Sequence, residues 1–385
     1  MLEIALKGSK KYWIWVIVLL GAMAVGFGAY IDQFNHGLTI TGMSRNVSWG
    51  FYIANFTFLV GVAAGGVMVA IPYYLHDYEK FHRITILGEF LAVASLVMCL
   101  LFIMVDLGQP VRVFNVLLHP TLHSMLFWDM CVLNGYLFLN IVIGWNVLEA
   151  ERNQVSPPKW VTPLIYLSIP FAIGIHTVTA YLYCGLPGRG YWLSAILAPR
   201  FLASAFAAGP ACLVLLCYII KKLTKFDPGW EAMQTLTKII CYALITNVFF
   251  FLCEVFKTYY SHIPEDKLHF NYLFFGLKGH SDMVPWMWTA YILMFLGIVL
   301  LIVPALRRNK TLLPFTCIIV IIGVWIDKSL GMIAGGFIPS PLDTITDYVP
   351  TGEELLITMG VVATGLFVLT ILYKLATTVK EEVRG

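Results

Sequence analysis

The sequence predicts an all-α polytopic membrane protein with about ten transmembrane helices. Its residues are 59% hydrophobic and only 12% charged, and the mean hydropathy is +0.81. A soluble chain of this length carries about twice that charged fraction. The apolar residues also gather into ten runs, each long enough to cross about 30 Å of hydrocarbon as a helix. We therefore expect one integral membrane domain over residues 1–385.

The first five runs are separated by polar stretches that end a membrane helix. Asp32 and Gln33 follow the first run where a signal peptide would have small residues, so this run is predicted to stay as a helix. Lys80 and Arg83 follow the second run. Gly108 follows the third, in the motif DLGQPVRV. The predicted spans are 12–31, 53–75, 86–105, 124–148 and 162–184.

The last five runs are bounded in the same way. Lys221 and Lys222 follow the sixth run, Arg307 and Arg308 the eighth, and Lys380 the tenth. The long loops between the other runs are rich in Gly, Pro and Trp rather than in basic residues. The predicted spans are 195–220, 236–260, 284–306, 311–333 and 354–377.

The distribution of the 25 Lys and Arg residues predicts the orientation. Most lie in the two termini and in the loops after the even-numbered runs. Because basic loops stay in the cytoplasm, both termini are expected to be cytoplasmic, in the cell membrane. The opposite, outward-facing loops hold the minority: Arg45, Arg112, Arg189, Arg200, Lys257, Lys267, Lys278 and Lys328.

The motif DLGQPVRV, residues 106–113, is then predicted to face outward. Gly108 and Pro110 stop the third span and turn the chain. Asp106 and Arg112 are placed to pair across this turn, or Asp106 simply caps the helix end.

Several ionisable side chains lie inside the spans, where a charge costs at least about 2.5 kcal/mol. At about 1.5 Å per residue, His176, Glu254 and Asp327 fall at a similar depth below the outer helix ends, with Asp129 near them. This outer layer is a candidate for proton exchange. Structural roles remain open: an ion pair between Asp327 and Lys328, or a packing role for His176.

A thinner polar trail continues inward from this layer. It is either half of a proton path or a set of hydrogen bonds between helices. Its members are Asn134, Asn140, Thr246, Asn247 and Glu89.

The histidines and cysteines argue against cofactors bound by this chain. Only His176 lies well inside a span, so paired histidines for a b-type haem are missing. The eight cysteines show no C-x-x-C spacing and are typical of helix packing. No metal site, haem or iron–sulfur cluster is expected on the chain, and no soluble catalytic motif occurs.

A lipid-soluble redox molecule fits the outer layer better. A quinone needs aromatic walls, donors to its carbonyl oxygens, and an acid or imidazole that exchanges protons. An aromatic belt at the membrane interface would explain the tryptophans alone. The side chains of suitable type are Trp49, Tyr52, Asn55, Thr57, His123, Trp128 and Asp129.

The chain resembles the NrfD/polysulfide-reductase membrane-subunit family, in the ten-helix branch that includes DsrP and HmcC. The resemblance rests on the order and spacing of several stretches along nearly the whole chain. They are SWGFYI (48–53), GVAAGG (61–66), DLGQPVRV (106–113), HPTLHSMLFWD (119–129), the run 179–211, GGFIPSPL (335–342) and YVPTGEE (348–354).

This resemblance implies two four-helix bundles, spans 2–5 and 6–9, with flanking helices. AAGG (63–66) and AAGP (207–210) are a faint echo of that repeat. It also implies electron exchange between menaquinone or menaquinol and an extracytoplasmic, ferredoxin-like iron–sulfur subunit of the DsrO kind. The complex would be of the DsrMKJOP type in sulfur metabolism, with further subunits that include cytochromes.

The expected sites follow from both lines of reasoning. His123, Asp129, His176 and Glu254 are expected to exchange protons with the quinone. The residues expected to bind it are Trp49, Tyr52, Asn55, Thr57, Asp106, Arg112 and Trp128. Two other functions stay open: a proton-coupled secondary transporter, and a purely structural membrane anchor.

Overall fold

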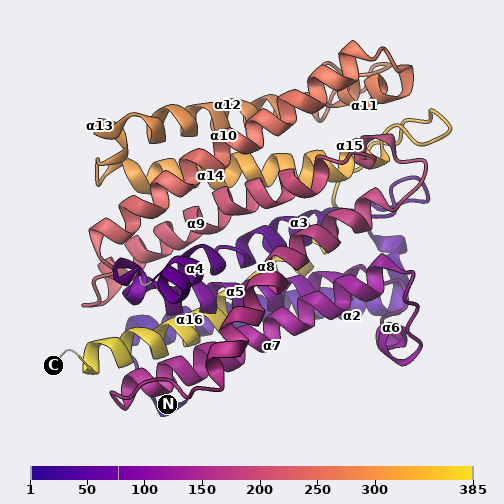
Figure 1. Cartoon of the computed structure of the whole chain (residues 1–385). Helices are drawn as coiled ribbons and strands as arrows, with labels where there is room; N and C mark the ends of the chain where they lie inside the picture. Colours follow the sequence, from indigo (N-terminus) through magenta and orange to yellow (C-terminus); the bar gives the residue numbers. More distant parts are fainter. Residues whose placement is uncertain (1, 77, 384–385) are drawn as a thin grey trace.

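The computed structural model describes residues 2–76 and 78–383, and this part of the chain is helical with no strands (Figure 1). Ten of its helices are long and apolar enough to cross a membrane. The predicted all-α fold with ten spans is therefore confirmed. The spanning helices are α2 (Lys10–His36), α3 (Phe51–Ala63) with α4 (Val67–His76), α5 (His82–Asp106), α7 (Met125–Arg152), α8 (Val161–Cys184), α9 (Leu197–Leu223), α10 (Trp230–Tyr260), α12 (Val284–Ile302), α14 (Leu312–Trp325) with η5 (Ile326–Gly331) and α15 (Met332–Phe337), and α16 (Gly352–Glu382).

Shorter helices occupy the connections. At one end of the molecule lie α6 (Asn115–Leu118), η4 (Gly190–Trp192) and α11 (Pro264–Phe274). At the other end lie α1 (Leu2–Ala5), η2 (Glu79–Phe81) and α13 (Pro304–Arg307). We call the first the loop end and the second the terminal end, because α2 begins and α16 finishes there (Figure 1). Helix α11 is an addition to the predicted elements.

The predicted spans form two four-helix bundles. In the first bundle α3 packs on α5, α5 on α7, α7 on α8, and α8 returns to α3 and α4. In the second bundle α9 packs on α10, α10 on α12, α12 on α14, and α14 returns to α9. The flanking helices α2 and α16 pack on each other, and α16 packs against α5.

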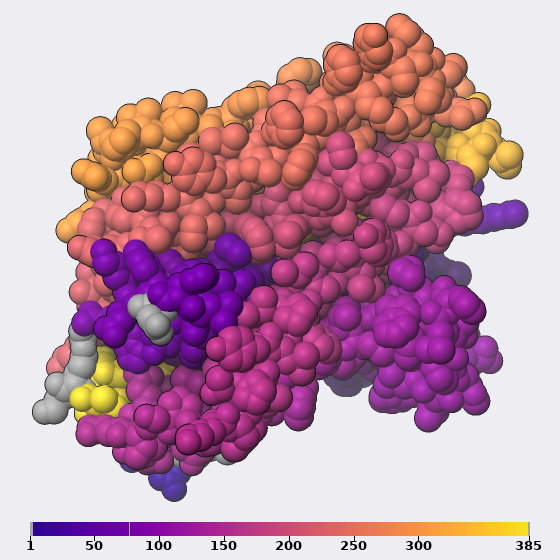
Figure 2. Space-filling model, viewed as in Figure 1, coloured from indigo at the N-terminus to yellow at the C-terminus, as the bar shows by residue number. Residues whose placement is uncertain are grey.

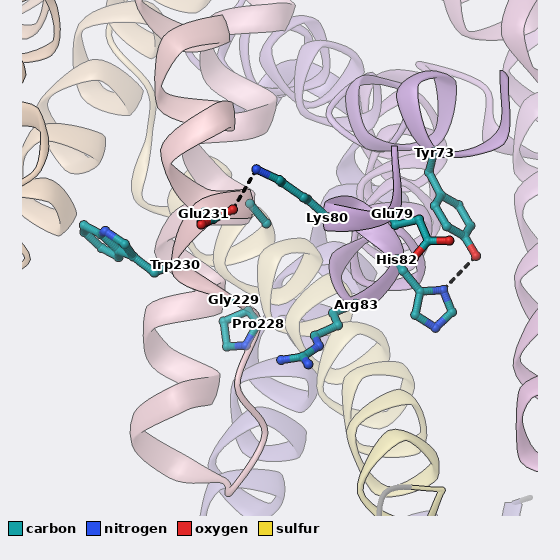
Figure 3. A pocket seen from close by; sticks show the side chains of 10 residues that line it. Tyr73, Glu79, Lys80, His82, Arg83, Pro228, Gly229, Trp230 and Glu231 are labelled. Carbon is teal, nitrogen blue, oxygen red and sulfur yellow. Dashed lines mark hydrogen bonds and ion pairs between the residues drawn. The ribbon is translucent and has the colours of Figure 1, made fainter. Parts of the chain in front are cut away.

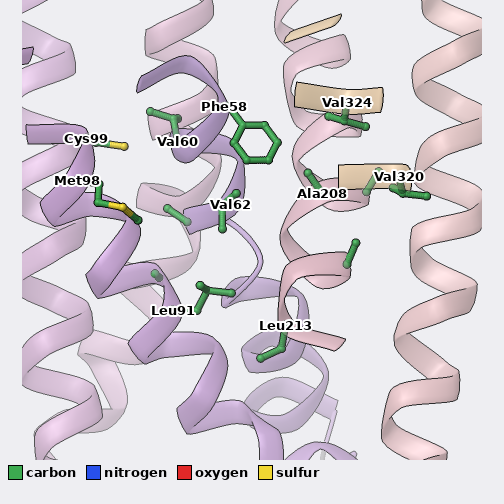
Figure 4. Packing of buried hydrophobic residues seen from close by; sticks show 14 of the residues in the cluster. Phe58, Val60, Val62, Leu91, Met98, Cys99, Ala208, Leu213, Val320 and Val324 are labelled. Carbon is green, nitrogen blue, oxygen red and sulfur yellow. The ribbon is translucent and has the colours of Figure 1, made fainter. Parts of the chain in front are cut away.

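One apolar core runs through both bundles. Side chains from α3, α5, α9 and α14 meet in it, among them Phe58, Met98, Ala208 and Val324 (Figure 4). Its continuity explains why the bundles pack as one body rather than as two separate halves.

The two bundles approach most closely where the small-residue echo occurs. A Cβ added to Gly65 would lie 2.7 Å from the carbonyl carbon of Gly209, and one added to Gly209 would lie 2.6 Å from Cα of Gly65. Small residues let helix backbones meet in this way, as they do in membrane helix pairs. The chain also leaves regular α-helix here, between Ala63 and Val67, so the second predicted span is broken in two.

The ninth span is also irregular. Its helix changes from α14 into a π-helical turn, η5, over Ile326–Gly331. Such a turn is rare and often marks a functional site. It places Asp327 and Lys328, both buried, in the middle of the protein.

Candidate functional site: a polar layer across the two bundles

Helix α8 carries three polar side chains on one face. His176, Thr179 and Tyr183 are spaced by three and four residues, so they lie above one another and are all buried. The Thr179 hydroxyl donates to Oδ1 of Asp129 on α7 over 2.6 Å. The hydroxyls of Tyr183 and Thr57 are hydrogen-bonded to each other. This face therefore gathers groups from α3, α7 and α8 at one place.

An aromatic wall closes this group towards the loop end. Trp49 stacks on Trp192 with ring centroids 5.8 Å apart, and it meets Tyr183 and Phe337 edge to face. Trp192 is fully buried and donates its indole N–H to the Met332 carbonyl oxygen over 2.9 Å. Trp49 is only half-buried, so its ring keeps an accessible edge beside the polar groups.

His176 is fully buried, and neither ring nitrogen has a hydrogen-bond partner within residues 2–76 and 78–383. Lys328 of the second bundle lies within electrostatic range of it. A buried unpartnered imidazole carries a desolvation cost of about 1–3 kcal/mol, which a packing residue would avoid. The ring therefore has free donor and acceptor capacity inside the layer.

On the other side of the layer a buried ion pair joins two helices of the second bundle. Nη2 of Arg200 lies 2.7 Å from Oδ1 and 2.9 Å from Oδ2 of Asp327. The Tyr291 hydroxyl donates to the same Oδ1 over 2.7 Å, and the guanidinium lies 5.3 Å from the Phe251 ring centroid. A charge pair taken out of water needs such additional hydrogen bonds.

In the described part of the chain Asp327 pairs with Arg200 and not with Lys328, so the alternative of an ion pair between these neighbours does not hold. The Lys328 ammonium donates to the Phe201 carbonyl oxygen over 3.0 Å and lies 4.5 Å from the Phe201 ring centroid. Adjacent helical residues point in different directions, so one faces Arg200 and the other the first bundle. Cys99 of α5 lies within electrostatic range of both Lys328 and Asp129.

We call this assembly the polar layer; it consists of Thr57, Asp129, His176, Thr179, Tyr183, Arg200, Tyr291, Asp327 and Lys328. Beside it lies a void of about 10 Å³, the size of a single water position. Arg200, Ser204, Asn247 and Lys328 are among the residues that line this void.

A second polar group lies on the opposite side of α3, towards α2 and α16. The Tyr52 hydroxyl donates to Oε1 of Gln33 over 2.7 Å, and Nε2 of Gln33 donates to the Val105 carbonyl oxygen over 2.6 Å. Asp106 ends α5 beside this group, and its Oδ1 is buried without a partner in the described residues. Asp106 lies within electrostatic range of both Tyr52 and Tyr183, so this group borders the polar layer.

The predicted ion pair between Asp106 and Arg112 is wrong, as far as the described residues show. Arg112 is exposed in the short turn η3 (Pro110–Arg112), while Asp106 keeps a buried oxygen at the helix end. Pro110 starts this turn and directs the following backbone away from α5. This corner at the loop end is therefore formed by backbone geometry rather than by a charge pair.

The loop that precedes α16 ties the loop ends of three helices together. The Tyr348 hydroxyl donates to Oε1 of Glu354 over 2.6 Å and accepts from the Phe51 N–H over 2.7 Å. Oε2 of Glu354 accepts from the Gly42 N–H over 2.8 Å. Burial and the bonded Glu354 carboxylate both raise the pKa of Tyr348, so its hydroxyl remains a neutral donor.

The remaining predicted site residues lie outside the polar layer. His123 and Trp128 are exposed at the loop end, and the Trp128 indole donates to the Leu122 carbonyl oxygen. Oε1 of Glu254 accepts from the Ser194 hydroxyl, beside Cys184 at the end of α8. Asn55 accepts from the Trp325 indole over 3.1 Å, on the side of α3 that faces α14.

Sequence reasoning missed Arg200, Tyr183, Thr179 and Tyr291. The charge count groups Arg200 with the outward-facing loops, at the edge of the predicted span 195–220, whereas the structure places it in the first turn of α9. The position of an acid at 327 inside a span was the available signal, since a buried carboxylate requires a cationic partner. No sequence signal identified the partner as Arg200.

Comparison with known proteins places this architecture in a family. The family model described as polysulphide reductase, NrfD, matches residues 39–339. A Halobacterium salinarum protein named as a membrane subunit of dimethyl sulfoxide reductase is 27% identical, over 92% of this chain and 88% of its own. The integral membrane subunit of a menaquinone reductase from Nitratidesulfovibrio vulgaris is 23% identical, over 95% of this chain and 91% of its own.

A third relative is the integral membrane subunit of an Hdr-like menaquinol oxidoreductase from Archaeoglobus fulgidus. It is 22% identical, over 78% of this chain and 72% of its own. The matched region contains both bundles and the whole polar layer. The chain is therefore a multi-span membrane protein that belongs to the polysulphide reductase NrfD family.

Proposed function

We propose that this chain is a quinone-interacting integral membrane subunit that exchanges electrons between menaquinone or menaquinol and an iron–sulfur subunit, with coupled proton transfer. The observation that carries the proposal is one buried face of α8, on which the unpartnered His176 and the Thr179 that is bonded to Asp129 lead to Tyr183, which packs against the half-buried ring of Trp49. Two similar proteins, from N. vulgaris and A. fulgidus, bear menaquinone or menaquinol in their names.

The residues present suit a quinone. Its ring needs an apolar, aromatic surface, which Trp49, Trp192 and Phe337 supply. Its carbonyl oxygens need donors, and the Tyr183 hydroxyl lies next to that surface. Thr57 donates its proton to the Ile53 carbonyl oxygen and accepts from Tyr183, so the Tyr183 proton is the one that can turn to a quinone oxygen. The unpartnered His176 ring and the Asp129 carboxyl are the groups suited to exchange its protons.

The other predicted binding residues lie around the site rather than in it in this proposal. Tyr52, Asn55 and Asp106 surround the loop-end half of α3, and Arg112, His123 and Trp128 lie on the exposed surface around it. We assign them to the approach of the quinone and to the rim of the site. Glu254 lies on α10 in the second bundle, and we assign it proton exchange within that bundle.

We place an extracytoplasmic, ferredoxin-like iron–sulfur subunit of the DsrO kind at the loop end. In this arrangement the termini are cytoplasmic, in the cell membrane, and residues 1–385 form one integral membrane domain. The complex includes further subunits, among them cytochromes, and serves sulfur metabolism as DsrMKJOP complexes do. The chain itself holds no haem, metal or iron–sulfur cluster.

The test is purification of the intact complex from native membranes and measurement of menaquinol-analogue turnover. Asp129→Asn keeps an acceptor for Thr179 but cannot exchange a proton, so turnover should fall on the order of 100-fold. Glu149→Gln, an exposed site on the same helix, is the matched control. Mass spectrometry of the same sample should find an iron–sulfur subunit and bound menaquinone.

A different result would contradict the proposal. If the intact complex neither contains nor turns over a quinone, the chain is not a quinone-reactive subunit. If Asp129→Asn, His176→Gln and Thr57→Val all keep full turnover, the polar layer is not the site.

A further inference from the structure

A cavity of about 810 Å³ opens at the terminal end of the molecule, away from the polar layer (Figure 3). It lies where α4 and η2, the purple segment of Figure 2, meet the start of α10. Lys80 and Glu231 bridge it with an exposed ion pair of 2.7 Å. Charged walls of this kind favour a water-filled space. Its lining residues are Tyr73, Glu79, Lys80, His82, Arg83, Pro228, Gly229, Trp230, Glu231 and Ala232.

A chain of protonatable groups begins at the wall of this cavity. The Tyr73 hydroxyl and Nδ1 of His82 are 2.7 Å apart (Figure 3). Nε2 of His82 lies 3.6 Å from Oε1 of Glu151 at the end of α7. The same oxygen accepts from Lys380 of α16 over 2.7 Å, and Lys380 is 5% exposed. The four residues Tyr73, His82, Glu151 and Lys380 thus connect the cavity wall to a buried position.

Glu89 lies one step deeper in the first bundle. It is 4% exposed, and its Oε1 accepts from the Tyr74 hydroxyl over 3.1 Å. Its Oε2 has no partner among the described residues. The other polar groups within electrostatic range of it are Tyr73 of α4, Tyr136 of α7 and Lys380 of α16. A structural hydrogen bond to Tyr74 needs only one of these two oxygens.

The buried face of α7 continues from Glu89 towards the polar layer. A Cβ on Gly144 would lie 3.6 Å from Oε2 of Glu89, so the carboxyl rests directly on this helix. Asn140, Tyr136 and Asp129 follow on the same buried face, at spacings of four and seven residues. From Glu89 the face leads to the acid that the proposed function assigns to the quinone.

We propose that Glu89 is a proton-loading site that takes protons from the terminal-end cavity through His82 and its hydrogen-bonded neighbours, and supplies the first bundle. A proton leaves cavity water, crosses the His82 group, and forms an O–H bond on the Glu89 carboxylate, which loses its charge. No electron moves in this step. Its use in quinone chemistry rests on the proposed function, whereas the loading of Glu89 from the cavity does not.

The first experiment is infrared difference spectroscopy of the intact complex in vesicles, recorded after the pH on the cavity side is lowered. A carboxyl carbonyl band should appear in the wild type, be missing in Glu89→Gln, and remain in the control Glu149→Gln. Because His82 is exposed, His82→Gln should leave the fold intact and slow the band's appearance on the order of tenfold. A bulky thiol reagent on Lys80→Cys, at the cavity rim, should slow it as well.

The second experiment separates this inference from the proposed function. While the intact complex reduces a menaquinone analogue, a reaction that consumes two protons per quinone, a pH dye on the cavity side should report proton uptake that Glu89→Gln abolishes. If the quinone turns over and uptake from that side is unchanged in Glu89→Gln, the inference is overturned and the proposed function stands. If no quinone turns over, the infrared band still decides: a band insensitive to Glu89→Gln or to the cavity-side pH overturns the loading site.

Discussion

At the scale of single residues, the polar layer depends on buried groups whose partners come from distant parts of the chain. Asp129 is bonded to Thr179, and Asp327 to Arg200, across 50 and 127 positions of sequence. Each group would be costly alone in an apolar environment. The layer is therefore stable only while every helix around it is in place.

The ion pair between Arg200 and Asp327 gives a direct test of this dependence. Arg200→Met leaves Asp327 as a buried unpaired acid, and we expect a loss of about 3–5 kcal/mol. The double variant Arg200→Met with Asp327→Leu removes both charges and should recover most of that loss. Unfolding of the purified protein in mild detergent measures both. Equal losses in the single and double variants would show that the pair itself is not what matters.

His269 predicts a pH dependence outside the membrane spans. Burial lowers its pKa below the usual 6.5, and Nδ1 lies 3.2 Å from the Ile338 carbonyl oxygen. The unfolded chain therefore binds a proton that the folded chain refuses once the pH falls below about 6.5. Stability is full above that pH and should decrease as the pH falls through the lowered pKa. Melting temperatures of the wild type and His269→Gln between about pH 8 and 5 check this, and parallel curves would refute it.

At the scale of helices, the contact of Gly65 with Gly209 determines how closely the two bundles approach. A methyl group on either residue meets backbone that no side-chain rotation relieves. We expect Gly65→Ala to destabilise the fold by about 1–3 kcal/mol through overpacking. Gly28→Ala is the control, because its added Cβ meets nothing within 4 Å. A Gly65→Ala protein that melts like the control would show that the contact is loose.

The break between α3 and α4 and the π-helical turn of the ninth span occur at the same interface between bundles. The first lets Gly65 approach Gly209, and the second directs Lys328 towards the first bundle while Asp327 faces Arg200. In a regular helix, fewer backbone positions of one bundle could approach the other bundle. These irregular turns thus position the groups that join the two halves of the polar layer.

At the scale of the whole molecule, the ends of the helices separate two kinds of surface. The terminal end carries Lys80, Arg83 and the cavity of about 810 Å³, whereas the loop end carries α6, α11 and the aromatic wall. With the proposed orientation, an alkaline phosphatase fused after Glu382 should be inactive and one fused after Asp343 active. Activity in both fusions, or in the first alone, would reverse the topology.

The fold class and the ten spans could be predicted from the amino-acid sequence, although some helices extend further than predicted, such as α10, which begins at Trp230 rather than at 236. Long apolar runs can only be satisfied as membrane helices, because lipid offers no partner for backbone polar groups. The resemblance also indicated the two bundles, which the packing confirms. Gly65 and Gly209 were visible as an echo, although their contact was not.

Which polar groups meet depends on how the helices pack in three dimensions. Helix periodicity limits the face on which a side chain lies, but it does not identify the neighbouring helix. Trp49 and Thr57 therefore meet through Tyr183, and Asp129 meets Thr179, whereas His123 is exposed and Asp327 pairs with Arg200. The cavity beside His82 lies between segments far apart in the sequence, and only their packing creates it.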